Sequence, residues 1–150
     1  PMPDPVIQAE RSTVHDCKLM DLPKIGERKG WITPIYGQEH VPFDIARVYY
    51  LYDIPGGATR AAHAHRRLPQ LMVSVLGSFE IVLGDGREKR VITLNRPYYG
   101  LYIPPGIWRE LVNFSSGAIC MVLASEYYSE PEYIRDYGAF LTVKGVRPAV

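Results

Sequence analysis

Two histidines one residue apart, His63 and His65, are the side chains whose spacing points most directly to chemistry. In a β-strand, residues i and i+2 project from the same face, so a strand here would hold both imidazoles side by side. Neighbouring imidazoles can bind a metal ion together, or they can exchange protons near neutral pH. The sequence therefore predicts either a metal site or an acid–base pair at this position.

The chain that must position these histidines has the size and charge of one domain with a local binding site. It has 150 residues and a formal net charge of +1, from 17 Lys and Arg against 16 Asp and Glu. This balance gives no field that would attract nucleic acid or a membrane surface, so we expect neither as a partner. We expect a single domain over residues 1–150, in which residues 1–14 and 143–150 are loosely ordered.

The cysteines and the hydropathy pattern indicate a soluble, cytoplasmic protein. Cys17 and Cys120 form no CxxC pattern, which argues against a disulfide framework or a cysteine-based zinc site. No run of eighteen apolar residues occurs, and the N-terminal residues lack the charged and apolar regions of a secretion signal.

Short apolar runs bounded by Gly, Pro, Asn and Asp predict an all-β chain. The runs span residues 17–22, 30–36, 46–54, 70–77, 78–86, 89–94, 98–105, 110–114 and 118–128. Nine short strands predict a barrel or a double-sheet jelly roll. Asp85-Gly86 predicts a hairpin in which both turn residues have positive φ. One short C-terminal helix is expected over residues 129–140, capped by Ser129 and ended by Gly138.

Two spaced patterns resemble the two sequence motifs of the cupin superfamily, whose members are small jelly-roll β-barrels. The first pattern comprises Gly57, His63, His65, Gln70 and Gly77. The second comprises Pro104, Gly106, Arg109 and Asn113, with the glycine that usually opens it displaced. The resemblance implies a single cupin domain and places the histidine pair in its barrel.

Metal-dependent cupins bind their metal through both histidines and a glutamate of the first motif and a histidine of the second. This chain has Gln70 at the glutamate position and Arg109 at the second-motif histidine position. A guanidinium has no lone pair and repels a nearby cation, and a neutral amide is a weak ligand for a transition metal. We therefore predict no metal and no other cofactor. An anionic or carbonyl-bearing ligand suits His63, His65, Gln70 and Arg109 better, with Arg60 as a second guanidinium.

Longer stretches resemble the TDP-4-keto-6-deoxy-D-glucose 3,4-ketoisomerases, a family of WxcM-like sugar-isomerase cupins. The matching stretches are residues 47–53 (RVYYLYD), 59–70 (TRAAHAHRRLPQ), 77–86, 100–110 (GLYIPPGIWRE) and 122–137. The resemblance implies a homodimer that can exchange N-terminal strands and a thymidine diphosphate-linked keto sugar as substrate. It implies the conversion of TDP-4-keto-6-deoxy-D-glucose to a TDP-3-keto-6-deoxyhexose in deoxyamino-sugar biosynthesis.

The resemblance also implies roles for the site residues. His63 would carry a proton between C3 and C4 through an enediol, and His65 would assist at the sugar oxygens. Arg60 would bind the pyrophosphate, but a regular strand puts it on the face opposite His63, so a bulge near residues 56–57 would have to turn it inward. Arg109, where some relatives carry histidine, would favour the gluco configuration of the product at C4.

Other positions leave alternatives open. Ala61 stands where relatives often have glycine, and we expect it to be tolerated only with a negative φ. Tyr50 and Tyr52 share one face of their strand and Tyr49 takes the other. The sequence does not decide which face lines the site, and we take Tyr50 and Tyr52 as substrate-binding candidates. Tyr102 is a further candidate, which either stacks on the thymine or fills the core.

Three other functions compete with the isomerase. A sugar-nucleotide 3,5-epimerase would need a tyrosine acid opposite the histidine and usually carries a lysine at position 70. A metal-dependent cupin oxygenase would contain stoichiometric metal. A sugar-binding cupin without catalytic activity would bind the nucleotide sugar and leave it unchanged.

Overall fold

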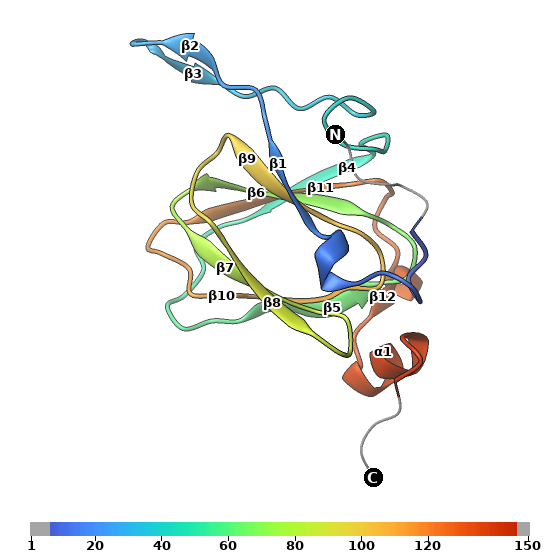
Figure 1. The fold of residues 1–150 in the computed structure, drawn as a ribbon. Coiled ribbons are helices and arrows are strands. Elements are labelled where there is room, and N and C mark those ends of the chain that lie inside the picture. The colour runs from blue at the N-terminus through green and yellow to red at the C-terminus, as the bar shows by residue number, and fades with distance from the viewer. Residues whose placement is uncertain (1–6, 147–150) are drawn as a thin grey trace.

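Two five-stranded antiparallel sheets face each other in the computed structural model, which describes residues 7–146 (Figure 1). The strands are β1 (Lys18–Asp21), β2 (Ile25–Glu27), β3 (Gly30–Ile32), β4 (Arg47–Leu51), β5 (Arg60–His65), β6 (Gln70–Leu76), β7 (Phe79–Gly84), β8 (Lys89–Leu94), β9 (Tyr99–Ile103), β10 (Trp108–Val112), β11 (Ile119–Ala124) and β12 (Tyr133–Ile134). The first sheet has the order β1-β9-β6-β11-β4, and the second has the order β12-β5-β10-β7-β8. The predicted double-sheet jelly roll is confirmed, with all nine predicted strands present. Strands β2, β5 and β12 lie outside the nine predicted runs, although the histidine spacing is that of a strand at β5.

The main core lies between the two sheets and explains why the strands pair in this register. Apolar side chains at alternate positions face inward from β6, β7, β9 and β11, among them Met72, Phe79, Ile81, Leu101 and Val122. Each such burial contributes about 1.5–3 kcal/mol. Part of this core, including Met72 and Val122, also lines the cavity between the sheets.

A second apolar layer covers the outer face of the first sheet. Segments before β4 bring Leu22, Val41 and Phe43 onto Leu71 and Tyr102. Tyr102 is 1% exposed within this layer, on the far side of its sheet from the main core. Its assignment as a substrate-binding residue is therefore wrong, and its role is in the core.

The C-terminal helix α1 (Tyr137–Val143) begins later than predicted. Residues 130–134 instead form a 3₁₀ turn, η2 (Glu130–Glu132), and strand β12, which pairs with β5. The side chain of Asp136 caps α1 by accepting a 2.8 Å hydrogen bond from the backbone of Ala139, whereas Ser129 makes no side-chain cap. Backbone pairing with β5 therefore prevails over the capping pattern. Over residues 7–146, no helix is long and apolar enough to span a membrane.

The two ends of the described chain are tied together, contrary to the prediction that residues 1–14 and 143–150 are loose. Ala9 and Ser12 are buried, and the ammonium of Lys144 donates to the Ser12 carbonyl at 2.7 Å and to the Ser12 hydroxyl at 3.0 Å. Lys144 also donates to the carbonyl of Ala9. The remainder of the two predicted loose segments, residues 1–6 and 147–150, lies outside the described residues.

Two hairpins differ in how they are held. In the β7–β8 turn only Gly86 has a positive φ, because the Asp85 carboxylate accepts hydrogen bonds from the backbone N–H groups of Arg87 and Glu88 and shapes the turn. The prediction of two positive φ angles is thus half right. The β2–β3 hairpin projects away from both sheets (Figure 1) and exposes the apolar side chains Ile25, Trp31 and Ile32.

Candidate active site

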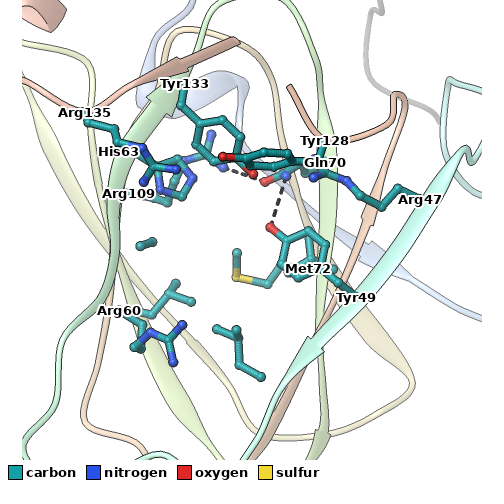
Figure 2. Close-up of a pocket in the computed structure, with 14 residues that line it drawn as sticks. Arg47, Tyr49, Arg60, His63, Gln70, Met72, Arg109, Tyr128, Tyr133 and Arg135 are labelled. Atoms are coloured by element: carbon teal, nitrogen blue, oxygen red, sulfur yellow. Dashed lines mark hydrogen bonds between the residues drawn. The ribbon is translucent and has the colours of Figure 1, made fainter. Parts of the chain in front are cut away.

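A cavity of about 400 Å³ lies between the two sheets, and arginines dominate its polar lining (Figure 2). The four arginines are Arg47, Arg60, Arg109 and Arg135. None of the described residues that line the cavity is acidic. Four guanidinium groups around one hollow favour an anionic ligand, with oxygen atoms that can accept several hydrogen bonds.

His63 reaches the cavity wall, whereas His65 does not. The ring of His63 is almost completely buried but lines the cavity, and the ring of His65 is fully buried and absent from the lining. The two rings meet edge to face with centroids 4.9 Å apart, and the ring of Tyr133 packs on both at 4.8 and 4.5 Å. The ring of His65 thus packs directly behind His63, and its expected role at the sugar oxygens stays a prediction.

Burial keeps both imidazoles neutral. Burial, and after it the charge of Arg109, lowers the pKa of His63 to about 3. The same two causes, in the same order, lower the pKa of His65. A neutral imidazole can accept a proton, so His63 has the protonation state of a general base at neutral pH.

A bulge in β5 brings Arg60 to the same cavity as His63. Ala61 and Ala62 have φ values of 70° and 57°, and the pairing register with β10 shifts between Arg109 and Glu110. The bulge predicted near residues 56–57 is thus found at residues 61–62. The expectation that Ala61 has a negative φ is wrong, because this residue makes half of the bulge.

A buried chain of hydrogen bonds runs from Arg109 through Gln70 to Tyr49. The Nη1 of Arg109 donates to the Oε1 of Gln70 at 2.8 Å, and the Nε2 of Gln70 donates to the hydroxyl of Tyr49 at 3.3 Å. Arg109 is 1% exposed, and burial lowers its pKa to about 10, so it remains protonated at neutral pH. Gln70, Arg109 and Tyr49 all line the cavity, as Figure 2 shows.

Several guanidinium nitrogens at the cavity have no protein partner. These atoms are Nη2 of Arg109 and Nε and Nη2 of Arg47, judged over residues 7–146. A buried donor without an acceptor costs about 1–3 kcal/mol, so a ligand that supplies oxygen atoms here would recover this free energy. Arg47 also stacks over the ring of Tyr49, with its guanidinium carbon 5.1 Å from the ring centroid.

The rim of the cavity carries a second cluster, formed by the segment between β11 and β12. Arg135 donates two hydrogen bonds to the Glu130 carboxylate, at 2.5 and 3.0 Å, and Tyr128 also donates to Glu130. The guanidinium of Arg135 lies 4.4 Å from the ring centroid of Tyr133, which in turn covers the two histidines. These contacts, chiefly that with Arg135, lower the pKa of Glu130 to about 2.

The structure selects Tyr49 rather than Tyr50 and Tyr52 on strand β4. Arg47, Tyr49 and Leu51 point into the cavity, while Tyr50 and Tyr52 lie on the outer face and are about 60% exposed. Their assignment as substrate-binding residues of this cavity is therefore wrong. Residues that sequence reasoning missed are Arg47, Tyr128, Tyr133 and Arg135, although all four lie in the stretches 47–53 and 122–137 that resemble the family.

The residues around the histidines do not fit a metal ion. Metal-dependent cupins carry a glutamate and a histidine ligand at two positions that are Gln70 and the protonated Arg109 in this chain. These two side chains are hydrogen bonded to each other. Within residues 7–146, no group of three or more His, Cys, Asp or Glu side chains is placed to hold a metal ion. No chemical step is therefore assigned to a metal.

Two facing antiparallel sheets with the histidine, amide and guanidinium side chains directed between them define this chain as a cupin. Comparison with known proteins agrees at the level of the family. The family described as FdtA, WxcM-like, C-terminal, matches residues 15–145. The chain belongs to this family.

Its relatives include proteins named as sugar isomerases. A TDP-4-oxo-6-deoxy-α-D-glucose-3,4-oxoisomerase of Aneurinibacillus thermoaerophilus is 42% identical over 123 residues, covering 82% of this chain and 88% of that protein. The crystal structure of a 3,4-ketoisomerase from Helicobacter canadensis matches with a TM-score of 0.84 and 44% identity, covering 87% and 98% of the two chains. A mutant of the 3,4-ketoisomerase QdtA from Thermoanaerobacterium thermosaccharolyticum, in complex with TDP-4-keto-6-deoxyglucose, matches with a TM-score of 0.83 and 40% identity, covering 84% and 91%.

Proposed function

We propose that this protein is a 3,4-ketoisomerase that converts TDP-4-keto-6-deoxy-D-glucose to a TDP-3-keto-6-deoxyhexose. The observation that carries the proposal is a neutral His63 on the wall of a cavity that is otherwise lined by four arginines. The imidazole supplies the base, and the guanidinium groups suit a diphosphate. The names of the relatives supply the sugar, since they act on or bind this 4-keto compound.

The reaction follows from the acidity of a hydrogen next to a ketone. The C4 carbonyl acidifies the hydrogen on C3, and His63 removes it to give an enediol. His63 then returns the proton to C4, which leaves the ketone at C3, and no electrons leave the sugar. An imidazole with a pKa of about 3 is a weak base. Negative charge that grows on the sugar oxygens beside Arg109 helps the imidazole to hold its proton in the transition state.

The diphosphate would be bound by Arg47, whose buried donors have no partner among the described residues, and by Arg60 across the cavity. Arg60 enters the cavity from β5 and Arg47 enters from β4, so they reach it from opposite sheets. Arg109 lies deeper, beside His63 and Gln70 (Figure 2). This arrangement would place the phosphates towards Arg47 and Arg60 and the sugar towards His63.

Incubation with TDP-4-keto-6-deoxyglucose in deuterated water tests the reaction. Proton NMR of the product is expected to show a ketone at C3 and a hydrogen or deuterium newly attached at C4. Exchange at C3 and C5 with the ketone retained at C4 would indicate a 3,5-epimerase instead. An unchanged sugar that still binds would indicate a protein that binds sugar nucleotides without catalysis.

Metal independence is a separate part of the proposal. It is supported by the hydrogen bond between Arg109 and Gln70, which occupies the positions that metal-dependent cupins use for ligands. Protein purified without chelators should contain no stoichiometric transition metal by mass spectrometry. Stoichiometric iron or nickel would contradict the proposal and favour an oxygenase.

We also propose a homodimer in which N-terminal strands can be exchanged. The β2–β3 hairpin exposes Ile25, Trp31 and Ile32, and an isolated two-stranded hairpin is at best marginally stable in water. The outer face of β4 exposes Val48 and Tyr50 as well. Sedimentation velocity is expected to show a dimer, and a monomer at micromolar concentration would contradict the proposal.

Two finer expectations accompany the reaction. We place it in the cytoplasm, in keeping with the two buried free thiols Cys17 and Cys120, and cell fractionation tests this. We expect the gluco configuration at C4 because Arg109 stands beside His63, and coupling constants of the product report it. An Arg109→His variant that leaves the C4 configuration unchanged would count against a role for Arg109 in that choice.

A further inference from the structure

Among the described residues, no side-chain hydrogen bond fixes the ring of His63. Catalytic histidines are commonly oriented by a hydrogen bond from one ring nitrogen to a carboxylate or a carbonyl. Neither nitrogen of the adjacent His65 ring has a partner within residues 7–146 either. Contacts between rings therefore orient the base.

The ring of Tyr133 makes these contacts. Its centroid lies 4.8 Å from that of His63 and 4.5 Å from that of His65, so one phenol ring packs on both imidazoles. The pairing of β12 with β5 places Tyr133 opposite His65. Strand pairing fixes the backbone but leaves the side chain a choice of rotamers. Whatever holds the Tyr133 ring in place therefore holds the base as well.

Arg135 lies over the ring of Tyr133 and is fixed there by Glu130. The guanidinium carbon is 4.4 Å from the ring centroid, on a side chain that is half exposed. The Glu130 carboxylate accepts hydrogen bonds from Nε of Arg135 at 2.5 Å and from Nη2 at 3.0 Å. Two parallel bonds set both the position and the plane of a guanidinium. Within residues 7–146, Arg135 is the one cavity-lining arginine that has a carboxylate partner.

The carboxylate of Glu130 is itself held from a second side. Tyr128 donates to it, and the backbone there enters the 3₁₀ turn η2, in which Pro131 restricts φ. Figure 2 shows Arg135, Tyr133 and His63 grouped on one side of the cavity. Glu130 does not line the cavity, whereas Arg135 does. Its influence on the base must therefore pass through Arg135.

On the basis of the proposed isomerase function, we propose that Glu130 is a positioning residue for the base His63. It acts through Arg135, which keeps the ring of Tyr133 seated on both imidazoles. This stack of side chains takes the place of the hydrogen bond that orients a catalytic histidine elsewhere, and it sets the angle at which His63 meets the hydrogen on C3. Misplacing a reacting group by about 1 Å can lower a rate by about 100-fold.

Histidine ring signals report this stack without any substrate. The chain has four histidines, so protein labelled with carbon-13 in the histidine rings gives four sets of ring signals in NMR spectra. The nearby Tyr133 ring shifts the signals of His63 and His65. Glu130→Gln is expected to change these two sets and to leave those of His15 and His40 as in wild type.

Kinetics with TDP-4-keto-6-deoxyglucose test the consequence for catalysis. Glu130→Gln should lower kcat by about 10-fold, with the Kd for TDP within about threefold of wild type and the thermal midpoint unchanged. In an Arg135→Gln background, the same change should lower kcat by less than about twofold, because its route to the base is already gone. Glu126→Gln changes an exposed carboxylate of the same segment outside the cavity and should leave kcat unchanged.

The possible failures are distinguishable. Unchanged histidine signals in Glu130→Gln overturn the positioning role, whether or not the protein is an isomerase. Changed signals with kcat within about twofold of an active wild type overturn its part in catalysis alone. A loss that adds in full to that of Arg135→Gln overturns the route through Arg135. A wild-type protein that forms no 3-ketone overturns the isomerase and the role of Glu130 together.

Discussion

Strands β4 and β5 present side chains to the same cavity from opposite sheets, but they do so by different means. In β4 the lining residues Arg47, Tyr49 and Leu51 follow the two-residue period of a regular strand. In β5 Arg60 and His63 are three residues apart, and only the two left-handed residues between them bring both side chains to the cavity. The regular strand β4 supplies hydrogen-bond donors to the cavity, whereas the bulged strand β5 supplies both the base and a guanidinium.

The largest expected effect comes from replacing His63, the base on the bulged strand β5. His63→Gln should lower kcat by at least about 1,000-fold, because an amide cannot accept the C3 proton. The Kd for TDP should change by less than threefold if His63 contacts only the sugar. Product formation measured by NMR and TDP binding measured by calorimetry check the two parts. Residual activity above a tenth of wild type would contradict the role of His63.

Arginine substitutions on β4 and β5 compare how much each strand contributes to phosphate binding. Arg60→Gln and Arg47→Gln should each weaken TDP binding by about 10- to 100-fold, because a hydrogen bond to a charged group contributes about 1.5–3 kcal/mol. Calorimetry with TDP measures the effect, and the exposed Arg66→Gln outside the cavity is the control. If only Arg47→Gln weakens binding, the bulge positions Arg60 for something other than the diphosphate.

The bulge itself can be tested by relieving it. A left-handed alanine costs about 1–2 kcal/mol, and glycine loses roughly 0.5–1 kcal/mol through its greater freedom in the unfolded chain. Ala61→Gly should therefore raise the free energy of unfolding by about 0.5–1 kcal/mol in denaturant titration. Ala46→Gly, at an exposed position without a positive φ, should lower it. A destabilised Ala61→Gly would show that the local strain at this bulge is small.

The smallest effect concerns pH. Since the pKa of His63 is about 3, kcat should change by less than about twofold between pH 7 and pH 5. Stability should behave differently, because unfolded histidines take up protons below about pH 6.5 and these buried ones do not. The thermal midpoint is thus expected to fall as pH decreases from 6.5 towards 3. A fall of kcat centred near pH 6.5 would contradict a desolvated base.

The sequence predicts the regular parts of this molecule well, because their signals are local. Alternating apolar residues and turn residues mark nine strands, and a two-residue period separates Tyr49 from Tyr50. The choice between those faces depends on which side of the first sheet meets the second, and that is a long-range property. Tyr102 shows the same limit, because the apolar layer that buries it comes from residues 22–43.

Sequence reasoning predicts the site residues whose spacing a motif fixes. It misses those whose position depends on the geometry of the backbone. His63, Gln70, Arg109 and Arg60 all line the cavity as expected. His65 does not, because the pairing of β5 with β12 places Tyr133 beside it and buries it completely. The bulge at residues 61–62 has no sequence signal, since two alanines do not favour positive φ. It was anticipated only from the need to turn Arg60 inward.

The contact of Lys144 with Ala9 and Ser12 has a consequence for synthesis on the ribosome. The amine is 132 residues away in sequence from Ser12, so residues 9–12 cannot make this contact until Lys144 has left the exit tunnel. Strand β1 waits as well, since its partner β9 begins at Tyr99. Residues 9–12 are therefore secured only once residue 144 is available, although they are synthesised far ahead of it.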